Sequence, residues 1–119
     1  MGRPAPPDDS TMRPVRFCPW YPLAEAGDRT PQEANVIQVR LAQGLHDYPR
    51  GKSEMLWYEH AVDARQAASR MAAACAGQDL LCRHLIEVET PDLADFCARL
   101  RAEFVRRFGT APALEGDPR

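Results

Sequence analysis

The stretch 80–109, LLCRHLIEVETPDLADFCARLRAEFVRRFG, places a strand pattern directly before a helix pattern. In residues 80–88, mostly apolar side chains recur at every second position on one face, which is the period of a β-strand. The following helix is expected to begin with Thr90 as its N-cap and Pro91 at its first helical position. An apolar stripe at helical spacing follows, and Gly109 is a typical residue for ending a helix.

Two further strands are expected upstream of this stretch. Residues 36–41, VIQVRL, alternate apolar and polar side chains, which predicts a half-buried strand. Residues 55–58, MLWY, form a short apolar and aromatic run that predicts a second strand. Because residues 44–53 between them are rich in turn-forming residues, we expect an antiparallel hairpin with a long loop.

A second helix is expected after this hairpin, over about residues 64–76. Asp63 is suited to the N-cap, and Gly77 is suited to ending the helix. The predicted order is therefore strand, strand, helix, strand, helix, without an internal repeat. This order predicts an α+β domain in which a small sheet of about three strands is flanked by two helices.

The N-terminal part of the chain has a different composition. Residues 1–16 are polar, rich in proline and aperiodic, which predicts a disordered tail. Residues 17–35 begin with FCPWYPL, and so many exposed aromatic side chains would create an apolar patch prone to association. We therefore expect an extended segment that packs on the body with Trp20 as its anchor, and a folded domain over residues 36–115.

Composition limits the classes of function. The 119 residues carry a formal net charge of −2, so contact with nucleic acid would have to depend on a local basic patch. The four cysteines have no C-x-x-C or zinc-type spacing, which predicts reduced thiols without a metal or cofactor. No stretch looks like a signal peptide or a bilayer-spanning segment, which predicts a cytoplasmic protein without membrane contact.

The loop 48–53, YPRGKS, is the first candidate site. It is not a Walker phosphate loop, because that motif requires a glycine at the position of His46 and a helix directly after the loop. Its charged and hydroxyl-bearing side chains nevertheless favour contact with an anion or a phosphate group. These candidate ligand-binding residues are Tyr48, Arg50, Lys52 and Ser53. An ordinary solvated hairpin loop is the alternative interpretation.

The histidines give weaker signals. His84 lies on a mostly apolar strand face without an identifiable partner carboxylate, so a satisfied core or edge position is favoured over catalysis. His60 follows Glu59 at an exposed junction between a strand and a helix, where a ligand-binding and a structural role stay open. No serine lies in a G-x-S-x-G elbow, so a serine hydrolase is not indicated.

The order of elements and several short stretches resemble the GIY-YIG nuclease-like domain. Val36-Ile37-Gln38 and Trp57-Tyr58-Glu59 stand where that family has its paired tripeptides. Asp63-Ala64-Arg65 stands where the family has an arginine-bearing helix start. Residues 103–109, EFVRRFG, with Pro112 beyond them, are similar to the family's last helix and its exit.

The resemblance implies catalytic positions at Tyr58, Arg65 and Glu103. In the family, tyrosine and arginine serve phosphoryl chemistry and the glutamate holds a divalent metal ion. The pattern is incomplete here, since Gln38 replaces the first tyrosine and Ala68 stands where the arginine is expected. A single carboxylate would bind Mg²⁺ poorly, so the resemblance implies a catalytically degenerate domain without a metal ion.

Three functional hypotheses follow. The first is a degenerate GIY-YIG-like domain that binds a phosphate-bearing ligand or a nucleic acid through the 48–53 loop and the adjacent cleft. The second is a small enzyme whose cleft uses Tyr58, His60, Arg65 and Glu103. The third is a protein–protein interaction module in which the aromatic segment docks on a partner. The net negative charge favours the first and third hypotheses over a duplex-DNA nuclease.

Overall fold

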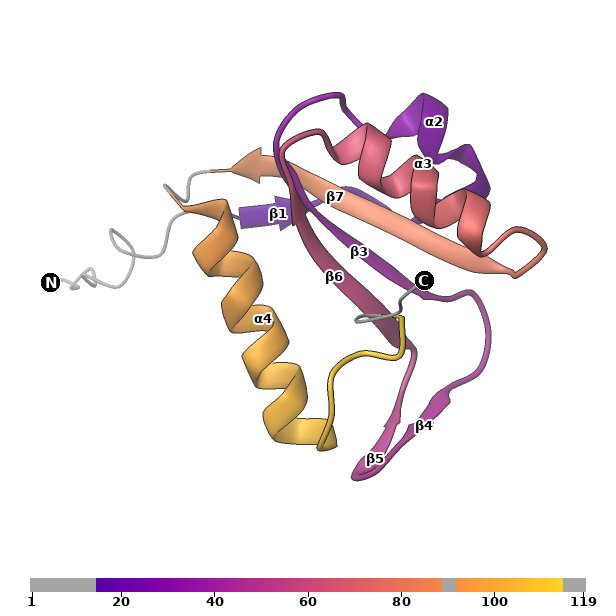
Figure 1. Cartoon of the computed structure of the whole chain (residues 1–119), viewed down its shortest axis with the longest axis vertical. Helices are drawn as coiled ribbons and strands as arrows, with labels where there is room; N and C mark the ends of the chain where they lie inside the picture. Colours follow the sequence, from indigo (N-terminus) through magenta and orange to yellow (C-terminus); the bar gives the residue numbers. More distant parts are fainter. Residues whose placement is uncertain (1–14, 89–91, 115–119) are drawn as a thin grey trace, which may run out of the picture.

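The computed structural model describes residues 15–88 and 92–114 and has an antiparallel five-stranded sheet at its centre (Figure 1). The strand of residues 35–41 lies between the strands of residues 55–61 and 80–88. Two short strands, residues 15–17 and 21–22, pair with the other edge of strand 80–88. The five strands are β1 (Val15–Phe17), β2 (Tyr21–Pro22), β3 (Asn35–Leu41), β6 (Met55–Ala61) and β7 (Leu80–Val88).

A smaller antiparallel sheet extends the β3–β6 hairpin away from the body. Its two strands are β4 (His46–Tyr48) and β5 (Gly51–Ser53), which are joined by a turn at Pro49 and Arg50. The predicted antiparallel pairing of residues 36–41 with residues 55–58 is confirmed by the register of β3 and β6.

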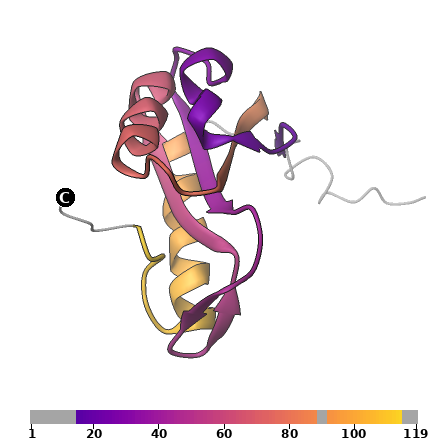
Figure 2. The same cartoon turned by 90° about the vertical axis from the view of Figure 1, so that its right-hand side faces the viewer.

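Helices cover both faces of the main sheet (Figures 1 and 2). Ile37 and Val39 of β3 pack in one core cluster, whereas Val36 packs in the other, because neighbouring residues of a strand point to opposite faces. The first cluster lies under the 3-10 helix η1 (Leu23–Glu25), α2 (Ala26–Arg29) and α3 (Ala64–Ala74). The second cluster lies under α4 (Leu93–Phe108).

The predicted count of about three strands and two helices is wrong. The described residues contain five strands in the main sheet, two in the smaller sheet and three α-helices. The additional elements form in residues 15–29 and 46–53, which are rich in proline or turn-forming residues. Strands of two or three residues are too short to show a period in the sequence, and they form because β7 or a neighbouring strand supplies their hydrogen-bond partners.

The N-terminal segment packs on the body, but its anchor differs from the prediction. Tyr21 and Leu23 are each only 3 % exposed and belong to the cluster under α3, whereas Trp20 is half-buried. Residues 15–16 were assigned to the tail and instead belong to β1, and residues 23–29 are helical rather than extended. The rest of the predicted tail lies outside the described residues.

The strand β3 is more buried than its sequence predicts. Its residues 35–39 are all buried, because α4 covers the face that carries Val36 and Gln38. The side chain of Asn35 extends the sheet, since its amide donates to the Leu85 carbonyl at 3.0 Å and its oxygen accepts from the Leu85 amide at 2.9 Å. The prediction of a half-buried strand is therefore wrong.

The helix ends follow ordinary capping chemistry. Asp63 caps α3 as predicted, and its carboxylate accepts a hydrogen bond from the Gln66 amide at 3.1 Å. Gly109 ends α4 as predicted, with a positive φ of 87°. At its start, α4 is capped by Asp92 rather than by Thr90, and Thr90 and Pro91 lie outside the described residues.

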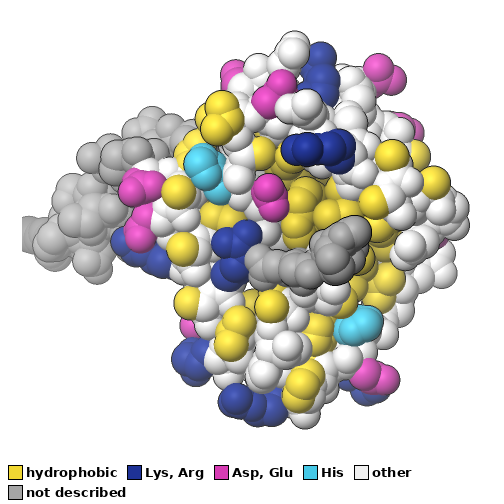
Figure 3. Space-filling model, in the orientation of Figure 1, with side chains coloured by type: hydrophobic (Ala, Val, Ile, Leu, Met, Phe, Trp, Pro, Cys, Tyr) yellow, Lys and Arg dark blue, Asp and Glu magenta, His cyan; other side chains and the backbone are white. Residues whose placement is uncertain are grey.

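The surface seen in Figure 3 has hydrophobic side chains gathered at its centre and basic and acidic side chains around them. Among the helices that the structure describes, none has the length and apolar character required to cross a membrane.

Candidate functional site

Side chains of the 48–53 loop hold it against the rest of the protein. The Tyr48 hydroxyl donates to the Met55 carbonyl at 2.7 Å and accepts from the Ala113 amide at 3.1 Å. The Tyr48 ring is buried and packs edge-on against Phe104 of α4 with centroids 4.9 Å apart. Tyr48 therefore joins the hairpin to the last helix, and its hydroxyl is already used within the protein.

The two basic side chains of this loop also have partners. The Arg50 amide donates to the Phe108 carbonyl and its guanidinium to the Arg106 carbonyl, each at 3.1 Å, so that Arg50 caps the end of α4. Lys52 forms an ion pair with Asp47 on the opposite strand of the hairpin. The loop thus supplies little unpaired positive charge, although Lys52 and Ser53 remain at the edge of the neighbouring pocket.

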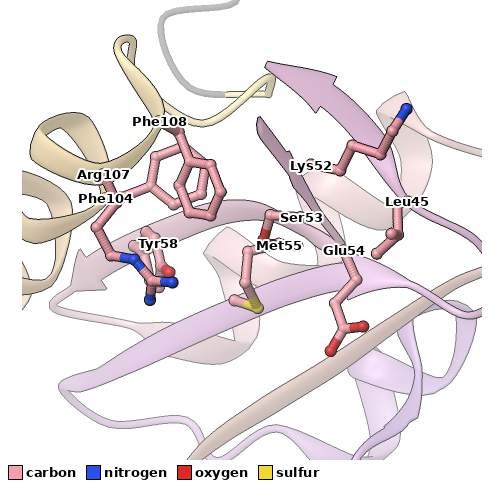
Figure 4. Close-up of a pocket in the computed structure, with 9 residues that line it drawn as sticks. All are labelled: Leu45, Lys52, Ser53, Glu54, Met55, Tyr58, Phe104, Arg107 and Phe108. Atoms are coloured by element: carbon pink, nitrogen blue, oxygen red, sulfur yellow. Dashed lines mark hydrogen bonds between the residues drawn. The ribbon is translucent and has the colours of Figure 1, made fainter. Parts of the chain in front are cut away.

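This pocket has a volume of about 320 Å³ and lies between the hairpin, β6 and α4. Figure 4 shows the aromatic rings of α4 on one side, the hairpin residues on the other and Tyr58 at the floor. The Lys52 ammonium points away from the other side chains, whereas the Arg107 guanidinium lies beside Tyr58. The lining residues are Leu45, Lys52, Ser53, Glu54, Met55, Tyr58, Phe104, Arg107 and Phe108.

Tyr58 is the buried polar group of this pocket. It is only 8 % exposed, yet its hydroxyl forms no hydrogen bond with any residue in the described ranges. Burial raises the pKa of Tyr58, whereas the nearby guanidiniums of Arg83 and Arg107 act in the opposite direction. A neutral phenol is therefore directed into a polar pocket with its donor and acceptor capacity unused.

Arg83 extends the basic surface from the pocket across the face of the sheet. Its guanidinium donates to the Gln38 side chain at 2.7 Å and stacks on the rings of Phe17 and Trp20, each with a centroid 4.4 Å away. Burial and the like charge of Arg40 lower the pKa of Arg83. It forms no ion pair with a carboxylate in the part of the chain that the structure describes.

Arg40 lies near Arg83, and Arg107 lines the pocket beside Tyr58. Arg40 stacks on Trp20 at 4.6 Å and pairs with Glu54 at 2.9 Å, so that its charge is partly neutralised. Arg107 is exposed and packs on the Phe108 ring, and within residues 15–88 and 92–114 it forms no ion pair. The surface around Tyr58 therefore carries more positive than negative charge.

The other predicted site residues do not converge on this pocket. Arg65 lies on α3, beyond the opposite face of the sheet, where its Nε donates to the Thr30 carbonyl at 2.7 Å. Glu103 projects from the exposed surface of α4 and pairs with Arg106, which lowers the pKa of Glu103. His60 is half-buried and pairs with Val36 in the sheet, at a position that does not line the pocket.

The predicted catalytic set of Tyr58, Arg65 and Glu103 is thus distributed over separate surfaces. Among the described residues, no group of three or more His, Cys, Asp or Glu side chains is arranged so that it could hold a metal ion.

Comparisons with protein-family models, with curated proteins and with solved structures find no match for this chain. The resemblance to the GIY-YIG nuclease-like domain therefore stays a prediction.

Sequence reasoning missed Arg83 and Arg107 as site residues. Arg83 lies between Leu81 and Leu85 on one face of its strand. An arginine between apolar residues on a strand face is unusual, and it could have indicated a functional position. Arg107 was explained by its position in the last turn of a helix, where basic residues are favoured anyway. Only the tertiary structure brings Arg107 into the pocket and Arg83 close enough to Tyr58 to act on its pKa.

Proposed function

We propose that the protein binds a phosphate-bearing ligand in the pocket above Tyr58. The proposal is carried by Tyr58, whose ring is buried while its hydroxyl faces the pocket without a hydrogen-bond partner among the described residues. Arg107 lines the same pocket, and Arg83 is close enough to act on the Tyr58 pKa. A phosphate group accepts hydrogen bonds from guanidinium and hydroxyl donors, and such charge-assisted bonds are stronger than neutral ones. The 48–53 loop contributes Lys52 and Ser53 to the edge of the site.

The size of the pocket favours a nucleotide-sized ligand over a duplex. About 320 Å³ lies within the range of small-molecule sites, and a duplex would require a longer basic surface than these few guanidiniums provide. The aromatic rings of Phe104 and Phe108 line the same pocket and offer apolar contact to a base or another flat group. A single-stranded oligonucleotide that inserts one nucleotide is the second arrangement to be tested.

Tyr58→Phe is expected to weaken binding of a mononucleotide about tenfold. The variant removes one hydrogen bond to a charged group, and solvent access to the pocket reduces its full value of about 1.5–3 kcal/mol. Because the hydroxyl has no partner among the described residues, the free energy of unfolding should not fall. Calorimetric titration with mononucleotides, inorganic phosphate and short single-stranded oligonucleotides at low and moderate salt measures the effect.

Arg99→Ala is the matched control, since Arg99 lies on the exposed side of α4 and pairs with Asp95 at 2.7 Å. It should leave affinity unchanged. If the wild-type protein binds none of these ligands, or if Tyr58→Phe binds as tightly as the wild type, the proposal is wrong.

We expect no nuclease activity with Mg²⁺ or Mn²⁺ on plasmid or single-stranded DNA. The reason is that Gln38 and Ala68 replace residues of the family pattern, and that Glu103 pairs with Arg106 at the surface. Gel assays with both metal ions test this expectation. Robust cleavage that disappears in Glu103→Ala would restore the chemistry of the GIY-YIG family and contradict a purely binding role.

A further inference from the structure

A second pocket lies at the middle of β7, where His84 points to the sheet face opposite to that of Arg83, outside the proposed phosphate site. It has a volume of about 170 Å³ and is lined by Cys18, Pro19, Tyr21, Arg29 and His84. Its position depends on the N-terminal segment, because the Cys18 amide donates to the His84 carbonyl at 2.9 Å and β2 pairs with β7 beside it. The pocket therefore combines a thiol, an imidazole, a phenol and a guanidinium.

The sulfur of Cys18 and the ring of His84 are arranged for proton transfer. Cys18 Sγ lies 3.6 Å from His84 Nδ1, and the same sulfur accepts a hydrogen bond from the His84 backbone amide at 3.5 Å. A thiolate is the reactive form of cysteine, and an imidazole in contact with the sulfur can take up the thiol proton as the sulfur attacks. Burial lowers the pKa of His84, so that the imidazole is neutral near pH 7 and carries a lone pair on one ring nitrogen.

Tyr21 contacts the same imidazole nitrogen as Cys18. Its hydroxyl lies 2.8 Å from His84 Nδ1 and 2.7 Å from Thr30 Oγ1, so that it can donate to the neutral Nδ1 and accept from the protonated Nδ1 while its own proton turns to Thr30. This arrangement has a nucleophile, a base in contact with it and a third group that orients the base. The charged groups nearest to His84 are Arg29, which lines the pocket, and Glu33, whose carboxylate raises the histidine pKa slightly against the effect of burial.

The other three cysteines have different surroundings. Cys75, Cys82 and Cys97 are at most 6 % exposed, whereas Cys18 is only partly buried. Burial raises the pKa of Cys82 to about 12, so that this thiol stays protonated. Cys18 is therefore the one thiol that combines access with a base among the residues described.

We propose that Cys18 is a reactive thiol that exchanges with small disulfides carrying a carboxylate, with His84 as the proton acceptor. The Cys18 thiol proton passes to His84 Nδ1, and the sulfur attacks one sulfur of the bound disulfide. The disulfide bond breaks, a mixed disulfide forms on Cys18, and the leaving thiolate takes the proton back from His84. Arg29 is the charged residue that contacts the carboxylate, and its partner Glu25 at 2.8 Å is exposed.

Oxidised glutathione and the neutral bis(2-hydroxyethyl) disulfide are the probes. With the native protein at neutral pH, mass spectrometry should find one adduct, on Cys18, and none in Cys18→Ser. Its formation should be at least tenfold faster than at Cys18 in the urea-unfolded chain. This comparison requires no variant at the buried histidine. An equal or slower rate in the native protein, or modification of another cysteine first, would overturn the proposal.

Two variants test the assigned roles. His84→Asn, checked for folding by circular dichroism, should slow the native reaction at least tenfold with both reagents. Arg29→Ala should slow the reaction with oxidised glutathione severalfold and leave the neutral disulfide unaffected. If His84→Asn folds and reacts as fast as the wild type, His84 is not the proton acceptor. Equal effects of Arg29→Ala on both reagents would refute the carboxylate contact.

Discussion

Tyr21→Ala is expected to lower the free energy of unfolding by about 3–5 kcal/mol, which is the usual cost of truncating a large buried aromatic side chain. The Tyr21 ring belongs to the core cluster under α3 and is 3 % exposed. Truncation also removes the hydroxyl that contacts Thr30 and His84, and Thr30 is fully buried. The substitution therefore creates a cavity and leaves buried polar groups without a partner.

Trp20→Ala is the matched comparison for this prediction, because it removes a larger ring from the adjacent position. Trp20 is half-buried and stacks under the guanidiniums of Arg40 and Arg83, and each such contact stabilises by about 0.5–1 kcal/mol at exposed sites. We expect its cost to be less than half that of Tyr21→Ala in urea denaturation. A larger loss for Trp20→Ala would mean that the segment is anchored by the residue the sequence first suggested.

The double variant Arg83→Met and Arg107→Met is expected to weaken mononucleotide binding about 100-fold. We assign the phosphate one charge-assisted contact with Arg107, which lines the pocket, and a second with Arg83, which lies outside the lining but close enough to act on the Tyr58 pKa. Partial solvent exposure reduces each contact to about tenfold in affinity. Methionine keeps an unbranched apolar chain, so that packing against Phe17, Trp20 and Phe108 is largely retained. Calorimetric titration measures the loss.

A control for this prediction must lower the net charge equally. Arg99→Met with Arg106→Met removes two positive charges from the exposed side of α4, where both residues pair with carboxylates of their own helix. If that control weakens binding as much as the Arg83 and Arg107 pair does, the ligand responds to the overall charge and not to the pocket.

Most of the elements predicted from the sequence have long patterns. The apolar stripe of α4 and the alternation in β7 extend over several turns or residue pairs, and the caps at Asp63 and Gly109 are local chemistry. The two-residue strand β2 has no such pattern. It forms because Tyr21 lies opposite Cys82 in β7, and sequence alone does not show that pairing.

The candidate site was predictable only in part. Tyr58 was named from the sequence and lines the pocket, and Lys52 and Ser53 lie at its edge. Arg50 has a charge that would suit a ligand, but the structure uses it to satisfy carbonyl groups at the end of α4. Whether a basic residue is available to a ligand depends on such tertiary partners, and the residue type does not reveal them.

The cap that Arg50 provides also bears on how the chain folds. The hydrogen bond from Arg50 to the Arg106 carbonyl spans 56 positions of sequence, and the one from the Arg50 amide reaches the neighbouring Phe108 carbonyl. The carbonyl groups of the last turn of α4 therefore receive hydrogen bonds from a hairpin that lies much earlier in the sequence. An isolated peptide of residues 93–108 lacks both donors, the guanidinium and the amide of Arg50. Closing so long a loop has an entropic cost, so the helix and its local cap at Gly109 can form first, and the Arg106 and Phe108 carbonyls gain their partners when the hairpin docks.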